Sequence, residues 1–142
     1  MISYTHKDWS LHPQLDADTV AVGDLALTRV LLNDDANYPW LILVPRLPAL
    51  VEIIDLDDNA QAQLLREVSD AARALQRITK CDKLNVAALG NQVPQLHVHV
   101  IARFRSDAAW PNPVWGKAAR KSYETDAREK LIGTLRQVLQ LS

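Results

Sequence analysis

QLHVHVI, residues 95–101, places two of the chain's four histidines two positions apart among aliphatic residues. On a β-strand, successive side chains point to opposite faces of the sheet. Gln95, His97 and His99 are therefore expected to share one face, and the aliphatic residues between them are expected to share the other. The aliphatic face predicts packing against a helix, and the polar face predicts a surface that is open to a ligand.

The composition limits the class of protein. The chain has 142 residues, of which 48% are hydrophobic and 23% charged, which is typical of a globular chain that can bury a core. We expect a single domain over residues 1–142. The formal net charge of −1 argues against binding to nucleic acid or to an acidic membrane surface, although a small anionic ligand needs only a local cluster of donors.

The cysteine count and the distribution of apolar residues limit the possible disulfide bonds and the cellular location. Cys81 is the only cysteine, which excludes a disulfide or a multi-cysteine zinc site within one chain. Residues 1–10 lack the apolar core of a signal peptide, and no run of sequence approaches the ~18 apolar residues of a membrane span. We therefore expect a cytoplasmic protein with no membrane partner.

The segment before the motif predicts a hairpin and a long helix. Residues 25–33 are aliphatic and β-branched, and residues 40–44 form a continuous apolar run, so they predict two antiparallel strands joined by a polar turn. Asp57 is expected to cap the long helix. The apolar stripe of this helix recurs at steps of three and four positions and comprises Leu64, Val68, Ala71, Leu75 and Ile78.

The remaining elements complete an α+β fold. Strands at 84–88 and 96–104 and a C-terminal helix over about 124–141 follow the long helix. The acidic residues Asp16 and Asp18 indicate the start of a short helix in an otherwise mixed N-terminal region. The main order strand-strand-helix-strand-strand-helix predicts an antiparallel β-sheet with the helices on one face.

The two histidines admit three interpretations from the residues alone. They are surface residues of a half-exposed strand, two ligands of a metal ion, or members of a covalent or acid–base site. A metal site needs a third ligand, and no Cys, Asp or Glu in the sequence is singled out for that role. A neutral imidazole, with a pKa near ~6.5, can attack an electrophile or exchange a proton at physiological pH.

The surrounding sequence resembles the histidine triad (HIT) superfamily, whose signature is His-φ-His-φ-His-φ-φ, with φ apolar. Residues 95–101 match this signature at every position except the first. The resemblance takes in the hairpin at 30–46, the long helix and the turn at 90–93, and WPNPVWG at 110–116 is similar to a Trp-Pro element that follows the motif in several HIT proteins. It implies a HIT-like α+β fold with a core over about residues 22–116.

The resemblance also implies an enzyme, a nucleotide hydrolase or transferase that acts on the α-phosphate of a nucleoside polyphosphate or phosphoramidate, such as a dinucleoside polyphosphate. The middle histidine, His97, attacks the α-phosphorus and forms a nucleotidyl-histidine, which water or another acceptor then resolves. A backbone carbonyl holds the other ring nitrogen of His97, and we expect that carbonyl within residues 88–90. His99 is expected to bind the phosphate oxygens or the leaving group and, when protonated, to offset developing charge.

Gln95 is the departure from the signature. A glutamine cannot carry a proton or a positive charge, but it donates and accepts hydrogen bonds. We therefore interpret Gln95 as a hydrogen-bonding substitute for the first histidine, which alters the proton inventory, the rate and the preferred leaving group. The alternative is a slow or non-catalytic nucleotide-binding or sensory module.

Three further residues are implied as nucleotide ligands. Asn33, at the end of the first hairpin strand, matches a position that meets the ribose hydroxyls. Asn91 matches a position whose amide contacts phosphate, and Gln92 lies beside it in sequence. Both asparagines also suit turns, because the asparagine side chain hydrogen-bonds its own local backbone.

The residues after the motif supply the remaining candidates. Arg103 continues the face of the two histidines and is expected to reach either a distal phosphate or Asp107. Trp110 and Trp115 are expected to stack on a base or to bury against a second subunit.

Partners and cofactors follow from the resemblance. HIT proteins are typically homodimers, so we expect a homodimer with a nucleotide as its small-molecule substrate. The covalent step requires no cofactor, and Mg²⁺ is expected only in the company of a polyphosphate substrate. His6 and His12 have no visible partner in the sequence, and we interpret both as surface residues.

Overall fold

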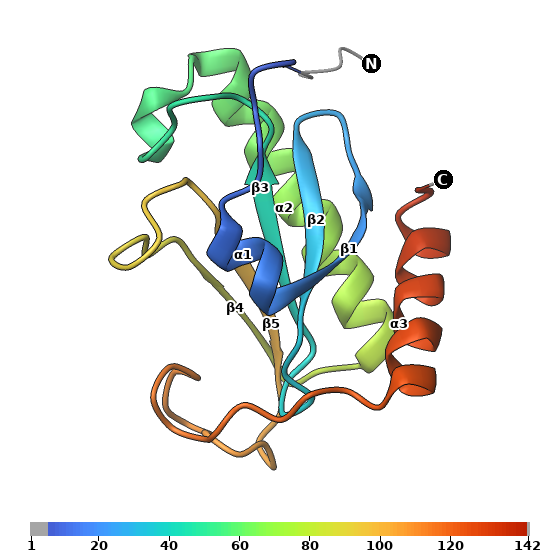
Figure 1. The fold of residues 1–142 in the computed structure, drawn as a ribbon. Helices are drawn as coiled ribbons and strands as arrows, with labels where there is room; N and C mark the ends of the chain where they lie inside the picture. Colours follow the sequence, from blue (N-terminus) through green and yellow to red (C-terminus); the bar gives the residue numbers. More distant parts are fainter. Residues whose placement is uncertain (1–5, 142) are drawn as a thin grey trace.

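The computed structural model describes residues 6–141 (Figure 1). Its elements are, in chain order, α1 (Pro13–Asp18), β1 (Thr19–Asp24), β2 (Thr28–Asn33), β3 (Trp40–Pro45), the short 3₁₀ helix η1 (Ile53–Asp55), α2 (Asp58–Thr79), β4 (Lys83–Ala87), β5 (Val98–Arg103) and α3 (Thr125–Val138).

The strands form one antiparallel sheet in the order β1-β2-β3-β5-β4. The predicted hairpin is confirmed as β2–β3, and the motif strand β5 inserts between β3 and β4. Register places Ile42 of β3 opposite His99 of β5, and Leu41 opposite Val100. The histidine therefore lies on the same face as Ile42, and the valine lies on the opposite face.

The long helices α2 and α3 cover one face of the sheet, as predicted. An apolar cluster joins these helices to the strands, and the aliphatic side of the motif belongs to it. Asp57 caps α2 as expected, because its side chain accepts a hydrogen bond of 2.8 Å from the backbone N–H of Ala60. The members that the motif contributes to this cluster are Leu96, Val98 and Val100.

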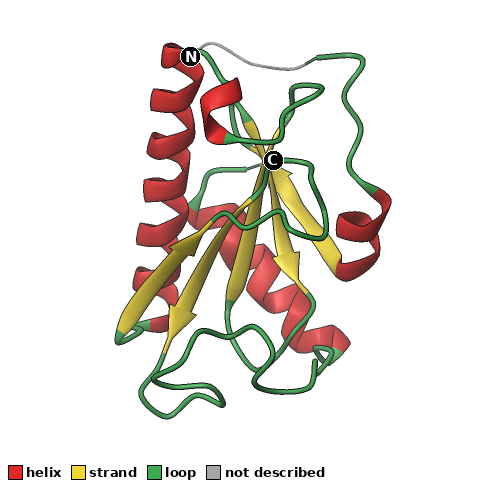
Figure 2. Ribbon diagram, turned by 90° about the vertical axis from the view of Figure 1, so that its left-hand side faces the viewer, coloured by secondary structure: helices red, strands yellow, loops and turns green. Residues whose placement is uncertain are grey.

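The short helix α1, which lies outside the predicted order of strands and helices, packs on the other face of the sheet. Figure 2 shows the sheet with the long α2 on its left and α1 on its right. A second apolar cluster covers this face. It includes Ile42 of β3, and the N-terminal segment contributes Trp9, Leu11 and Leu15. The N-terminal region thus covers the face on which His99 lies.

Strand β1 was not predicted from the sequence, and the short helix begins earlier than the predicted start at Asp16. The helix begins at Pro13, and His12 is its N-cap. Because β1 is an edge strand, half-exposed and interrupted by a bulge between Ala21 and Gly23, it lacks a clear alternating pattern.

Other boundaries differ by a few residues. Strand β2 begins at Thr28 rather than at residue 25, because residues 25–28 form the turn after β1, in which the N–H of Leu25 donates to the carbonyl of Thr28 at 2.8 Å. The buried carboxylate of Glu67 accepts hydrogen bonds from the backbone N–H groups of Leu27 and Thr28 at 2.9 and 2.8 Å. The motif strand begins at Val98, so His97 lies just before it. The helix α3 ends at Val138, three residues short of the predicted end.

Candidate functional site

The ring of His97 is fixed through its Nδ1 atom, which lies 2.7 Å from the backbone carbonyl oxygen of Gln95. A carbonyl oxygen only accepts hydrogen bonds, so Nδ1 of His97 is the donor. In the neutral ring this leaves the lone pair on Nε2. The expectation of a carbonyl within residues 88–90 is therefore wrong, and the acceptor lies two residues upstream of the ring, where the chain enters β5.

His99 is held in the opposite tautomer. The indole Nε1–H of Trp40 donates a hydrogen bond of 3.0 Å to Nδ1 of His99. An indole nitrogen is a donor only, so Nδ1 of His99 is the acceptor and the neutral ring carries its proton on Nε2. Burial lowers the pKa of His99 to about 4, with a smaller contribution from the nearby His97. The protonated His99 considered from the sequence is therefore not the form present near neutral pH.

Edge-to-face contacts join the two histidine rings to each other and His99 to two tryptophans. The rings of His97 and His99 are 4.9 Å apart and meet edge to face. The ring centroid of Trp115 lies 5.1 Å from that of His99 and 5.6 Å from that of Trp40, and both contacts are edge to face. Such contacts fix ring orientation as well as excluding water.

Both histidines line a cleft of about 630 Å³, which we call the histidine cleft. The residues that line it come from α1, the sheet, the turn before the motif and the segment after β5. They are His12, Gln14, Leu15, Asp18, Asn33, Trp40, Ile42, residues 89–93, His97, His99, Trp115 and Arg120. The structure therefore brings the predicted residues Asn33, Asn91 and Gln92 together with His97 and His99.

Two other predicted residues lie elsewhere among the described residues. Arg103 is 2% exposed. Its guanidinium donates hydrogen bonds to the side chains of Asp107 and Asn85 and to the backbone carbonyl of Asn112. A phosphate could reach it only by displacing these partners, so the structure assigns Arg103 to Asp107. Trp110 also lies outside the histidine cleft and has the Arg103 guanidinium 5.8 Å from its ring centroid.

Gln95, which the sequence analysis grouped with the histidines, does not line the histidine cleft with its side chain. Its side-chain amide is hydrogen-bonded to the backbone of the N-terminal segment. Oε1 accepts a hydrogen bond of 2.9 Å from the backbone N–H of His12, and Nε2 donates one of 2.9 Å to the carbonyl of Ser10.

Several residues of the histidine cleft were not predicted from the sequence: Trp40, which holds His99, is one, and His12 and Arg120 are two more. His12, interpreted as a surface residue, is half-buried and lines the cleft. Arg120 donates to the carbonyls of Asp18 and Asp34 at 3.0 and 2.9 Å, and to Oδ1 of Asn33 at 3.3 Å. No local pattern could have found His12 or Arg120, because both reach the cleft only through tertiary contacts.

Comparison with known proteins identifies the family. The model of the HIT domain matches residues 14–106. This chain belongs to the HIT domain family. No curated protein matches the chain.

Crystal structures of histidine triad proteins are similar to this HIT protein over nearly its whole length. One from Bradyrhizobium japonicum has 58% sequence identity and a TM-score of 0.91, covering 92% of this chain and 98% of that one. One from Marinobacter aquaeolei VT8 has 43% identity and a TM-score of 0.90, covering 94% and 98%. One from Sinorhizobium meliloti 1021 has 36% identity and a TM-score of 0.89, covering 92% and 96%.

Residues 6–141 of the HIT protein contain neither a cluster of metal-ligating side chains nor a membrane-spanning helix. No three His, Cys, Asp or Glu side chains gather there in a way that could hold a metal ion. None of the helices in the same range has the length and hydropathy required to cross a membrane.

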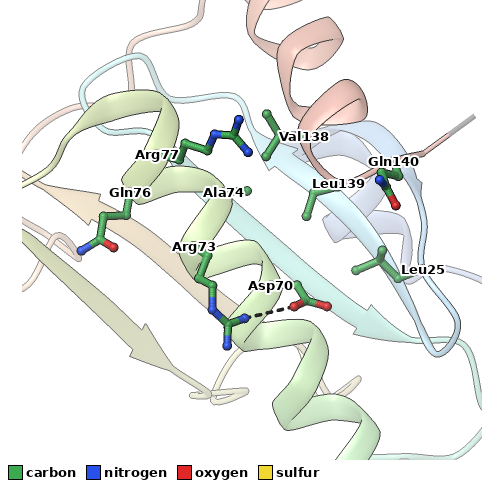
Figure 3. Close-up of a pocket in the computed structure, with 9 residues that line it drawn as sticks. All are labelled: Leu25, Asp70, Arg73, Ala74, Gln76, Arg77, Val138, Leu139 and Gln140. Carbon is green, nitrogen blue, oxygen red and sulfur yellow. Dashed lines mark hydrogen bonds and ion pairs between the residues drawn. The ribbon is translucent and has the colours of Figure 1, made fainter.

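The HIT protein has a second sizeable hollow, of about 580 Å³, between α2 and the end of α3. Figure 3 shows the ion pair of Arg73 and Asp70, which lie beside each other on α2, with Leu139 on the opposite wall. The side chains of this ion pair are 72% and 48% exposed, so solvent screens their charges. This hollow holds no histidine, and its chemistry does not compete with that of the histidine cleft.

Proposed function

We propose that this protein is a nucleotide hydrolase or transferase in which His97 attacks the α-phosphorus of its substrate. One observation carries the proposal. The 2.7 Å contact between Nδ1 of His97 and the carbonyl of Gln95 leaves Nε2 with its lone pair in a cleft large enough for a nucleotide. The fold and family are consistent with nucleotide binding or hydrolysis.

The proposed reaction has two displacements. In the first, the Nε2 lone pair of His97 forms a bond to the α-phosphorus. The bond from phosphorus to the bridging oxygen or nitrogen breaks, and the leaving group departs with the electron pair and takes any proton it needs from water. In the second, a water oxygen attacks phosphorus, the N–P pair returns to Nε2, and the proton of that water passes to solvent. In a transferase, the hydroxyl of an acceptor replaces the water.

His99 is proposed to bind the phosphate as a neutral donor. Trp40 occupies its Nδ1, so the Nε2–H is the group that it can offer to a phosphate oxygen. A hydrogen bond aimed at the charge that develops on phosphorus lowers the barrier without any proton transfer. We therefore do not assign His99 the role of general acid.

The rest of the nucleotide is proposed to lie along the histidine cleft. Because Oδ1 of Asn33 accepts from Arg120, the Nδ2 amide protons of Asn33 are the ones to meet a ribose hydroxyl. Asn91 and Gln92 are exposed at the rim and suit the phosphates. Trp115 offers a ring to the base.

Substrates of the proposed enzyme are a dinucleoside polyphosphate or a nucleoside phosphoramidate. Mg²⁺ would enter with a polyphosphate, as part of the substrate. Gln95 is proposed to occupy the first triad position and to act through hydrogen bonds alone, since an amide carries no proton at neutral pH.

We also propose a homodimer, formed along the edge strand β4. This strand is the free edge of the sheet beside β5, and an unpaired edge is a template for association. Large apolar side chains are exposed on β4, in the segment that follows it and on α2, with Val86 at 52%, Leu89 at 45% and Leu65 at 67% exposure. A second copy would cover them.

A turnover screen tests the function. Nucleoside polyphosphates and nucleoside phosphoramidates are offered to the wild type, to His97→Ala and, as a matched control, to His6→Ala, whose ring is exposed. We expect turnover by the wild type and the control, and a loss of roughly 10³-fold or more in His97→Ala. A nucleotide that binds wild type and His97→Ala equally well, with turnover in neither, would instead identify a nucleotide-binding module.

A further inference from the structure

The N-terminal segment, residues 9–18, forms one wall of the histidine cleft. Trp9, Leu11 and Leu15 anchor it to the second apolar cluster, on the face of the sheet that carries His99. Figure 1 shows this segment and α1 crossing in front of the sheet. The segment thus brings residues that are distant in sequence from the motif to the edge of the cleft.

The side chain of Gln95 holds the N-terminal segment in place through two hydrogen bonds. Its amide accepts from the N–H of His12 and donates to the carbonyl of Ser10, each at 2.9 Å. The oxygen and the nitrogen of a side-chain amide are bonded to the same carbon and point in similar directions. They can therefore hydrogen-bond an N–H and a carbonyl of the same stretch of backbone. The two nitrogens of an imidazole diverge, and a histidine at position 95 could not make both bonds.

The ring of His12 is oriented by a bond of its own. Nδ1 accepts a hydrogen bond of 3.0 Å from the backbone N–H of Gln14, so the neutral ring carries its proton on Nε2. This is the tautomer that Trp40 imposes on His99. The histidine cleft therefore holds three imidazoles, His12, His97 and His99, of which His97 offers a lone pair and the other two offer N–H donors.

We propose that His12 supplies the third imidazole of the site, in place of the histidine that the motif lacks at position 95. Its Nε2–H donates to the phosphate chain of the bound nucleotide. Gln95 is the positioning residue, because it touches no substrate and acts by holding His12. The substrate in this inference is the nucleotide of the proposed function. The roles of His12 and Gln95 are inferred from the two hydrogen bonds of the Gln95 side chain and from the residues that line the histidine cleft.

The test separates the donor of His12 from its helix-capping role. His12→Asn keeps a side chain that caps helices well but removes the imidazole. His6→Asn is the matched control, since Nδ1 of His6 makes the same local bond, to the N–H of Asp8 at 3.1 Å, on the exposed surface. With diadenosine tetraphosphate and adenosine 5′-phosphoramidate as probes, we expect kcat/KM of His12→Asn to fall by about 10- to 100-fold and that of His6→Asn to stay within about twofold of wild type.

Gln95→Ala tests the positioning role by a double-mutant cycle. If Gln95 acts through His12, Gln95→Ala lowers kcat/KM in the wild-type background but changes it by no more than about twofold in the His12→Asn background. Amide hydrogen exchange of residues 6–12 should also become faster in Gln95→Ala, which measures the release of the wall directly. Full additivity of the two losses would overturn the link between Gln95 and His12.

A binding measurement keeps this inference distinct from the proposed function. The affinity for adenosine monophosphate is measured by calorimetry for wild type, His12→Asn and His6→Asn. If the wild type shows neither turnover nor a nucleotidyl adduct, the proposed chemistry fails, and an affinity that falls only in His12→Asn still supports His12 as a phosphate ligand. Unchanged affinity together with unchanged turnover in His12→Asn would overturn the inference.

Discussion

Trp40 donates its indole N–H to Nδ1 of His99 over 3.0 Å, and this bond decides what His99 can do. A proton on that nitrogen would face the indole proton, so the bond and the burial of the ring act together to keep His99 neutral. Burial, with a smaller contribution from the nearby His97, lowers the pKa of His99 to about 4. At neutral pH His99 is a hydrogen-bond donor through Nε2 and carries no charge.

Trp40→Phe removes the donor while keeping an aromatic ring in the second apolar cluster. We expect the pKa of His99 to rise by roughly 1, because the neutral ring loses one hydrogen bond that favours it. The measurement is an NMR titration of the imidazole carbon-bound protons. Trp110→Phe is the control, since Trp110 lies outside the histidine cleft, and a His99 titration that is the same in both variants would contradict the assignment.

Stability should depend on pH through the same ring. The folded pKa of about 4 lies below the ordinary histidine value of 6.5, so between these two values the unfolded chain binds a proton that the folded chain does not. The free energy of unfolding therefore falls as pH drops from 6.5 to 4, by about 3 kcal/mol from this residue, and is unaffected by it above 6.5.

Urea unfolding of the wild type and of His99→Asn at pH 7 and pH 4 measures this contribution. The wild type should lose more stability than the variant over this interval. His6→Asn, with an exposed ring, should behave as the wild type does. Equal losses in wild type and His99→Asn would show that His99 titrates alike in both states.

The ion pair of Arg103 and Asp107 is expected to be structural. Their side chains are 2% and 3% exposed. Burial acts to raise the pKa of Asp107, but hydrogen bonds from Arg103 and from three backbone N–H groups outweigh it and lower that pKa to about 2. Asp107→Asn leaves the buried guanidinium uncompensated and should cost about 3–5 kcal/mol of unfolding free energy.

Denaturant unfolding and activity per folded molecule test this assignment together. Asp70→Asn is the control, because its partner Arg73 is exposed and such pairs contribute less than about 1 kcal/mol. Turnover per folded molecule of Asp107→Asn should stay near that of the wild type. A specific loss of substrate affinity would contradict the structural role and indicate that Arg103 binds a phosphate of the substrate.

The proposed dimer predicts the effect of a charge on the β4 edge. Val86→Glu places a carboxylate on a side chain that is 52% exposed, and a charge there opposes strand pairing between copies. Light scattering should give twice the chain mass of 15.9 kDa for the wild type and the chain mass itself for Val86→Glu. Ala21→Glu, on the exposed outer edge at β1, should leave the dimer intact.

The sequence predicted the parts of the site that depend on local periodicity. The period of two along the motif placed His99 on the face opposite Val100, and the hairpin and the long helix followed from equally regular patterns. Asn33 and Asn91, implied by the resemblance, also line the histidine cleft. These features need only the neighbouring residues to be recognised.

What the sequence could not predict comes from contacts between distant segments. Gln95 bonds the backbone of Ser10 and His12, more than eighty positions away, so its use could not be read from the motif. The sequence left Arg103 between a distal phosphate and Asp107, and the Asn85 side chain, eighteen positions away, helps to hold its guanidinium in the buried pair with Asp107. Strand β1 is held by pairing with β2 more than by its own composition.

The most direct test looks for the covalent intermediate on His97. Wild type is mixed with diadenosine tetraphosphate or adenosine 5′-phosphoramidate, quenched in alkaline denaturant within one turnover, and digested for mass spectrometry. We predict a gain of one nucleoside monophosphate unit on the peptide that contains His97, appearing and decaying at rates that account for turnover, and no such gain in His97→Ala. Turnover by the wild type with no adduct on His97, or with the adduct on another residue, would contradict the account.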